Sequence, residues 1–141
     1  MLVRLMYASR AAKPLDPEEL TQILRHSRVA NPKIGITGVL CSSGDLFIQV
    51  LEGGRTAVNR LYNRIVTDGR HTDVTLLAYE EISERRFAGW AMGQVNLARL
   101  NPALMLKYSE TAALDPYAVP GKAAVALFDE LVATAAVVCQ G

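Results

Sequence analysis

The sequence has little of what builds metal sites and disulfide frameworks. Its 141 residues include only two cysteines and two histidines. Cys41 and Cys139 lie far apart and belong to no Cys-x-x-Cys or Cys/His cluster, so the number of ligands argues against a zinc site. A disulfide between them is an alternative, but a domain of this size folds without one. We therefore expect reduced thiols and a cytoplasmic protein.

An excess of charge of one sign is also missing. Fifteen Lys and Arg residues face fourteen Asp and Glu residues, which leaves a formal net charge of +1. Non-specific binding to nucleic acid needs a basic surplus, so we expect no nucleic-acid partner.

Long hydrophobic runs are absent as well. The longest strongly apolar run, Leu131 to Cys139, is less than half the length of a membrane span. The first seven residues lack a basic segment followed by an apolar stretch, so no signal peptide is predicted. We therefore expect no membrane partner.

The sequence is rich in hydrophobic residues, which make up 50% of the chain. That fraction, with its balanced charge, excludes intrinsic disorder and suits one compact domain. Alternating apolar residues from Leu2 to Ser9 predict an opening strand. Asp16 is a good helix N-cap before Pro17 and Glu19, and Asn31-Pro32 is predicted to end this first helix.

The rest of the chain alternates in the same way between strand and helix patterns. Glu52-Gly53-Gly54 is predicted to break the third strand before the second helix, and Asp68-Gly69 to stop that helix. The predicted elements are a strand over Ile34 to Cys41, a strand over Leu46 to Leu51, a helix with Val58, Leu61, Tyr62 and Ile65 on one face, a long strand over Thr72 to Ile82, a fifth strand over Trp90 to Leu97, and helices over Ala103 to Tyr108 and Ala123 to Val138.

This order predicts an α+β fold, the ferredoxin-like βαββαβ arrangement with an added fifth strand. Both helices of the repeat should cover one face of a mixed sheet. The C-terminal helices are the natural cap for the other face, or they cover a second subunit. We expect a domain over residues 1–97 and a helical extension over residues 98–141.

Motifs for catalysis are not found: there are no paired carboxylates, no Ser/His/Asp set and no phosphate-binding loop. A few neutral polar or soft side chains lie on apolar elements instead: Tyr7, Asn31, Gln49, Trp90 and Met92. Each of them also suits a purely structural role. Gln49 is the hardest to explain in that way, because a buried amide without partners costs about 1–3 kcal/mol.

Two sequence runs carry a family resemblance. One is Asn31-Pro32-Lys33-Ile34-Gly35-Ile36-Thr37-Gly38-Val39-Leu40, and the other is Phe47-Ile48-Gln49-Val50-Leu51-Glu52-Gly53. With Tyr7 near the end of the first strand and the run Trp90-Ala91-Met92-Gly93, they resemble the BLUF family, the flavin-binding blue-light sensor domains. The resemblance covers about residues 1 to 97.

The resemblance implies a flavin, usually FAD with FMN as the alternative, between the two helices. It implies that Tyr7 and Gln49 flank the reactive edge of the flavin and that Asn31 hydrogen-bonds its pyrimidine side. The remaining implied site residues line the cavity or meet the ribityl and phosphate portion; they are Ser9, Ile23, Phe47 and Ile65 for the first group, and Arg64, Asp68, Arg70 and His71 for the second. For His71, a loop residue near a helix end is the structural alternative.

The resemblance also implies a photoreceptor rather than an enzyme. Light would drive transfer of an electron and a proton from Tyr7, and the Gln49 amide would rearrange by rotation or tautomerisation and shift the absorption to the red. The signal would leave through the fifth strand, with Trp90 and Met92, and the C-terminal helices. It would reach a separate protein partner or change the state of a homo-oligomer.

Two other classes of function are open for the same residues, an enzyme on a ferredoxin-like scaffold and a plain ligand-binding or assembly domain. A flavin reductase would need access for a nicotinamide, and an acylphosphatase-like hydrolase would need a phosphate-cradling loop that the sequence lacks. In a plain ligand-binding or assembly domain on the ferredoxin-like scaffold, Gln49 and Tyr7 would merely satisfy each other.

Overall fold

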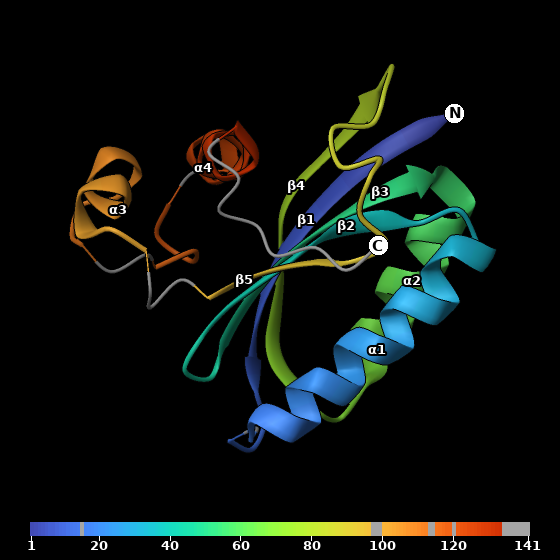
Figure 1. The fold of residues 1–141 in the computed structure, drawn as a ribbon, viewed down its shortest axis with the longest axis horizontal. Helices are drawn as coiled ribbons and strands as arrows, with labels where there is room; N and C mark the ends of the chain where they lie inside the picture. Colours follow the sequence, from blue (N-terminus) through green and yellow to red (C-terminus); the bar gives the residue numbers. More distant parts are fainter. Residues whose placement is uncertain (15, 97–99, 113–114, 120, 134–141) are drawn as a thin grey trace.

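The computed structural model describes residues 1–14, 16–96, 100–112, 115–119 and 121–133. They form a five-stranded sheet with the strand order β4-β1-β3-β2-β5 (Figure 1). The elements along the chain are β1 (Leu2–Ala11), α1 (Pro17–Lys33), β2 (Thr37–Ser43), β3 (Leu46–Gly54), α2 (Arg55–Thr67), β4 (His71–Ile82), β5 (Gly93–Asn96), α3 (Pro102–Tyr108) and α4 (Gly121–Ala133).

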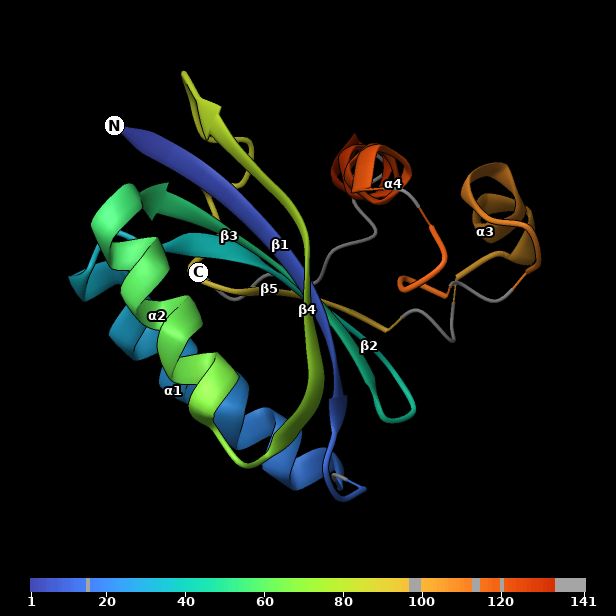
Figure 2. The ribbon, with the colours of Figure 1, turned by 180° about the vertical axis from the view of Figure 1, so that it is seen from behind.

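The strand pairing confirms the ferredoxin-like arrangement with an added strand. β1 pairs antiparallel with β3 and β4, and β2 and β3 form an antiparallel hairpin. β5 adds to β2 in parallel, which makes the sheet mixed. α1 and α2 cover one face, and α4 lies on the other (Figure 2). Among the helices of the described ranges, none is long and apolar enough to cross a membrane.

The start of α1 is as predicted, and its end is not. The Asp16 side chain accepts a hydrogen bond from the Glu19 backbone N–H at 2.8 Å, and Pro17 occupies the first turn. The helix continues through Pro32 to Lys33, because the Asn31 carbonyl still accepts from later N–H groups. Gly35, with φ +72°, then turns the chain, so β2 begins at Thr37 and not at Ile34.

The prediction that Glu52-Gly53-Gly54 breaks the third strand was wrong. All three residues pair with β1, and Glu52 lies opposite Arg4. Gly38 on the neighbouring strand marks a close approach of two backbones, since a Cβ there would lie 2.1 Å from the Val50 carbonyl oxygen. β3 therefore runs to Gly54, and its last residues are held by sheet pairing rather than by their own propensity.

The fifth strand is shorter than predicted. It comprises Gly93–Asn96, and Trp90 to Met92 precede it in the connection from β4. Leu97, the last residue of the predicted strand, lies outside the described residues.

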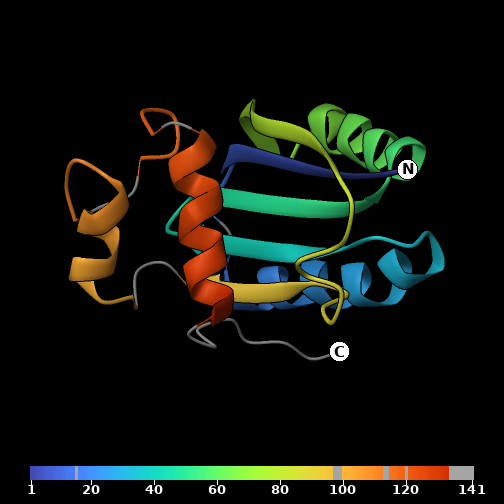
Figure 3. The same ribbon diagram turned by 90° about the horizontal axis from the view of Figure 1, so that it is seen from above.

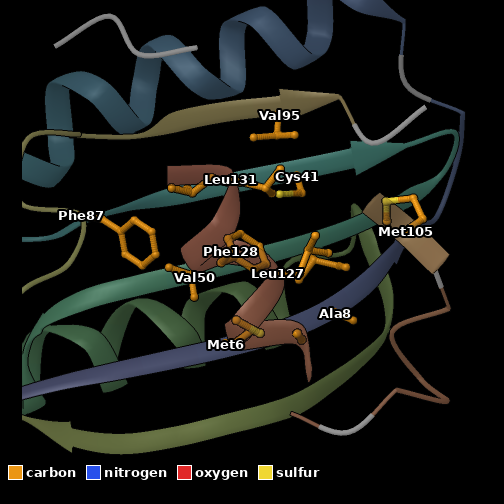
Figure 4. Packing of buried hydrophobic residues seen from close by; sticks show 13 residues of the cluster. Met6, Ala8, Cys41, Val50, Phe87, Val95, Met105, Leu127, Phe128 and Leu131 are labelled. Atoms are coloured by element: carbon orange, nitrogen blue, oxygen red, sulfur yellow. The ribbon is translucent and has the colours of Figure 1, made fainter. Parts of the chain in front are cut away.

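The two faces of the sheet carry separate hydrophobic clusters. The cluster under α1 and α2 contains Val3, Leu5, Tyr7, Leu24, Ile36, Leu40, Phe47, Leu51, Val58 and Met92. The cluster on the opposite face, which we call the α4-side cluster, joins β-strand residues such as Met6, Ile48, Val50 and Val95 to Leu127, Phe128 and Leu131 of α4 (Figure 4). The alternation of β1 and β3 thus separates two cores, as period-2 patterning requires.

α4 caps the sheet of its own chain and runs across the strands (Figure 3). It comprises Gly121–Ala133, whereas the sequence predicted Ala123 to Val138, whose end at 134–138 lies outside the described residues. α3 starts at Pro102, where the Asn101 side chain caps it. Cys41 is a buried free thiol in the α4-side cluster, and Cys139 lies outside the described residues.

Candidate functional site

A cavity of about 460 Å³ lies between α1, α2 and the sheet. That volume falls in the range that holds a small organic ligand or cofactor. Most of the residues that the sequence and its family resemblance singled out line it: Tyr7, Ile23, Asn31, Phe47, Gln49, Arg64, Ile65, Asp68, Arg70 and His71. Other residues of α1 and the sheet complete the wall, among them Leu20, His26, Ile34 and Leu40.

At the inner end of the cavity three side chains are joined by hydrogen bonds. The Tyr7 hydroxyl donates to Oε1 of Gln49, and Nε2 of Gln49 donates to the Met92 sulfur at 3.4 Å. All three side chains are buried, with relative exposures of 2%, 8% and 1%. The Gln49 amide oxygen therefore accepts from a phenol, and one amide N–H donates to a sulfur, which is a weak acceptor.

Two residues of α1 bind the backbone of the segment that carries Met92. Nδ2 of Asn31 donates to the Ala91 carbonyl at 3.1 Å, and Nε of Arg28 donates to the Met92 carbonyl at 3.0 Å. The position of Met92 is thus fixed through its side chain by β3 and through its backbone by α1.

The outer end of the cavity is charged and more exposed. Arg64 lies there on the last turn of α2, followed by Asp68, Arg70 and His71. Hydrogen bonds from Arg70 lower the pKa of the Asp68 carboxyl to about 2. Burial lowers the pKa of His71, whose Nδ1 lies 3.0 Å from the Ser9 hydroxyl.

The phenol at the inner end stays protonated over the ordinary pH range. Burial raises the pKa of Tyr7 above its usual value, and the negative charges that Tyr62 and Asp68 can carry act in the same direction. Removal of a proton from this hydroxyl therefore needs a coupled driving force, because a buried phenolate without a partner is costly.

Three predicted site residues do not lie on the cavity wall, Ser9, Trp90 and Met92, of which Met92 bonds to the lining residue Gln49. Ser9 contacts His71 instead, and Trp90 packs against the α4-side cluster, with its ring centroid 6.1 Å from that of Phe87. In a strand, residues 90 and 92 would share a face, but both precede β5, so the alternation does not apply to them. The structure therefore brings Met92 to Gln49 and places Trp90 on the opposite side of the sheet.

Sequence reasoning missed two residues around this site. The sequence pattern did not single out Arg28, and it assigned Glu52 to a break after the third strand. Glu52 is fully buried, and it accepts hydrogen bonds from Arg4 and from the backbone of Arg86 and Phe87. A carboxylate opposite an arginine on the paired strand was the available signal, but it requires the register of β1 and β3.

The donor and acceptor set suits one kind of ligand. The inner end offers neutral amide and phenol groups, which match the edge of a planar heteroaromatic ring. The outer end offers Arg64 and Arg70, which match an anionic tail. An isoalloxazine ring with a ribityl phosphate has both parts, so the residues present fit a flavin.

Comparison with known proteins points the same way. The family model described as "Sensors of blue-light using FAD" (BLUF) matches residues 2–93. A photoactivated adenylate cyclase subunit beta of Euglena gracilis is 42% identical over 84 residues, which are 60% of this chain and 10% of that protein. The chain thus spans about a tenth of the length of that curated relative.

Two solved structures match nearly the whole chain. The dark state structure of BlrB, a BLUF protein, superposes with a TM-score of 0.78 at 35% identity and covers 95% of this chain and 96% of its own. The photo-activated state of BlsA has a TM-score of 0.81 at 32% identity and covers 94% and 95%. Because the family model spans more than half of the chain and BlrB is 35% identical over 95% of it, the chain belongs to the BLUF family of flavin-binding blue-light sensors.

Proposed function

We propose that the cavity binds FAD with its ring at the inner end and its phosphates at the outer end. Asn31 and Gln49 would hold the polar edge of the ring, and Phe47, Ile23 and Ile65 its faces. Arg64 and Arg70 would hold the phosphates, with Asp68 and His71 beside them. FMN would make the same ring and first-phosphate contacts, so the choice between the two depends on the outer end.

The bound flavin would supply absorption of blue light and an excited state that accepts an electron. Tyr7 is the group that can give up an electron and a proton, and its hydroxyl already donates a hydrogen bond to Oε1 of Gln49. When the hydroxyl proton moves away, Oε1 of Gln49 loses the hydrogen bond that it accepts from Tyr7. The amide would then reorient or tautomerise. A glutamine suits this role because its amide has an acceptor oxygen and two donor hydrogens on one rotatable group.

The output would begin at Met92. Reorientation of the Gln49 amide removes the Nε2–sulfur hydrogen bond, so the segment before β5 loses one of its attachments. A change of about 1 kcal/mol shifts a poised equilibrium severalfold without remodelling the fold. Val95 of β5 shares a cluster with Leu131 of α4, so a displaced β5 would reach the C-terminal helix.

We infer that the chain signals to a separate protein, or through its own oligomeric state, and turns over no substrate itself. The support is the sensor family that matches residues 2–93, together with the contacts that lead from Met92 and β5 to Leu131 of the C-terminal helix. Cytoplasmic location is part of the same proposal. Titration of a candidate partner in the dark and in the light, with the oligomer measured by light scattering, tests this part.

The observation that carries the proposal is the Tyr7–Gln49–Met92 chain of hydrogen bonds in a flavin-sized cavity. The purified protein should be yellow, and blue light should shift its absorption reversibly to the red. Gln49→Leu removes the amide, and Gln49→Glu keeps the size but removes the N–H donors. Both variants should bind flavin and show no red shift. A variant that keeps the full shift, or a wild type that cannot be reconstituted with flavin, contradicts the proposal.

A further inference from the structure

The connection between β4 and β5, residues 83–92, carries Met92 and crosses from one edge of the sheet to the other without regular structure of its own (Figure 3). It is held in place by hydrogen bonds to other elements. One group of these bonds lies at Arg86 and Phe87, and the other at residues 90–92. Only the second group includes a bond to the Gln49 amide.

The Arg86–Phe87 end is bound to a buried carboxylate. Glu52 of β3, 0% exposed, accepts from the backbone N–H of Arg86 at 3.0 Å and of Phe87 at 2.7 Å. It also accepts from Nε and Nη2 of Arg4 at 2.9 and 2.7 Å. Hydrogen bonds to an ionised acceptor are about twice as strong as neutral ones, and burial strengthens them further. This end is therefore firmly attached to the strand that carries Gln49.

The same two residues hold the C-terminal helix. Nη1 of Arg86 lies 2.7 Å from Oδ2 of Asp129, and the Phe87 ring packs edge-on against Phe128 at a centroid distance of 6.5 Å (Figure 4). Both partners belong to α4. Glu52 thus fixes the backbone of Arg86 and Phe87, and the side chains of these two residues contact α4.

The Met92 end depends on the state of the cavity. The Met92 sulfur accepts a weak bond from Gln49 at 3.4 Å. The backbone carbonyls of this end accept from other elements: Ala91 from Asn31 at 3.1 Å, Met92 from Nε of Arg28 at 3.0 Å, and Trp90 from the Gly38 N–H at 3.0 Å. A change in the Gln49 amide acts directly on the first of these bonds. It has no direct contact with the bonds made by Glu52, which faces the other side of the sheet.

We propose that Glu52 is a positioning residue that fixes the Arg86–Phe87 end of this connection to β3, so that a rearrangement at Gln49 displaces Met92 and β5 but not residues 86 and 87. The inference deepens the proposed function and depends on it for the light-driven part. If Arg86 and Phe87 stay in place, the displacement at Met92 does not reach the middle of α4 through their contacts with Asp129 and Phe128. The displacement would then reach α4 through the contact between Val95 of β5 and Leu131 of α4, which belong to one hydrophobic cluster.

Residue-resolved amide hydrogen exchange of the flavin-loaded protein tests this inference. In the wild type, illumination should change exchange at Trp90 to Asn96 and leave the Arg86 and Phe87 amides as protected as in the dark. In Glu52→Gln these two amides should exchange roughly tenfold faster already in the dark, because a neutral acceptor replaces the carboxylate. Illumination should then change their exchange as well, while the red shift itself is retained.

Glu80→Gln is the matched control. Glu80 accepts from Nη1 of the same Arg4 at 2.8 Å but makes no bond to Arg86 or Phe87, and its side chain is 49% exposed. Its variant should give the wild-type exchange map. The inference is overturned if wild-type Arg86 and Phe87 respond to light as strongly as Met92, or if Glu52→Gln leaves their dark exchange unchanged. If Glu52→Gln does not fold, the wild-type map decides. If the wild type shows no red shift, the proposed function fails, and the dark comparison still tests the attachment.

Discussion

Tyr7 and Gln49 lie directly opposite each other on β1 and β3, and the tyrosine hydroxyl donates to the glutamine amide oxygen. Opposite residues of an antiparallel pair project to the same face, so this register aims both side chains at the cavity. The bond holds the amide in one orientation and directs its N–H towards Met92. The resting state of the site is therefore determined by one strand pairing.

Tyr7→Phe should abolish the light-induced red shift and keep the fold. It removes the hydroxyl that Gln49 accepts from, while the ring contact with Tyr62, at a centroid distance of 5.7 Å, is retained. The unsatisfied amide oxygen should lower the free energy of unfolding by about 1–3 kcal/mol. Absorption spectra under blue light and urea unfolding measure the two effects. Tyr62→Phe is the control, and a red shift that survives in Tyr7→Phe would contradict the role of the phenol.

Met92→Leu should separate the spectral response from the output. The substitution nearly conserves volume, so it should cost less than about 1.5 kcal/mol, but it removes the sulfur that accepts from Gln49. We expect a red shift to persist while the light-dependent change in hydrogen exchange of β5 and the end of α4 falls by at least about half. Met105→Leu, in the α4-side cluster, should leave both responses unchanged. An unaltered exchange response in Met92→Leu would exclude this route.

Arg64→Ala should weaken binding of the phosphate-bearing flavins and not of riboflavin. Arg64 lines the outer end of the cavity, and Arg60, one turn earlier on α2, does not. Because Arg64 is exposed, its effect should be modest, about 1 kcal/mol or roughly fivefold in Kd, and it should shrink at high salt. Fluorescence titration with FAD, FMN and riboflavin measures it, with Arg60→Ala as the control. Equal loss for riboflavin would mean that Arg64 does not meet the phosphate.

The stability of the protein should fall on the acid side because of His71. Burial lowers its pKa in the folded state below the ordinary value of 6.5, so the folded protein binds this proton less readily than the unfolded chain. Stability that is present above pH 6.5 should therefore be lost as the pH falls from that value towards the folded pKa. His71→Gln should flatten this part of the pH profile in thermal unfolding. An unchanged slope in His71→Gln would show that other groups cause it.

The sequence by itself determined the element types and the division of the strands into two faces. The alternation in β1 and β3, the Asp16 cap and the stop at Asp68 follow from local rules, because period and capping are properties of neighbouring residues. The two sequence runs around Asn31 and Gln49 indicated the family because the residues of each run are contiguous in the chain.

Only the tertiary structure decided which residues meet. The pairing of Glu52 with Arg4, the bond from Arg28 to Met92 and the side on which Trp90 packs join residues that are distant in the sequence. They depend on strand register and on the path of an irregular connection, which no local pattern encodes. Whether α4 covers its own sheet was open in the same way, because an apolar helix face matches any apolar sheet face. In the structure Leu127, Phe128 and Leu131 of α4 pack on the sheet of the same chain.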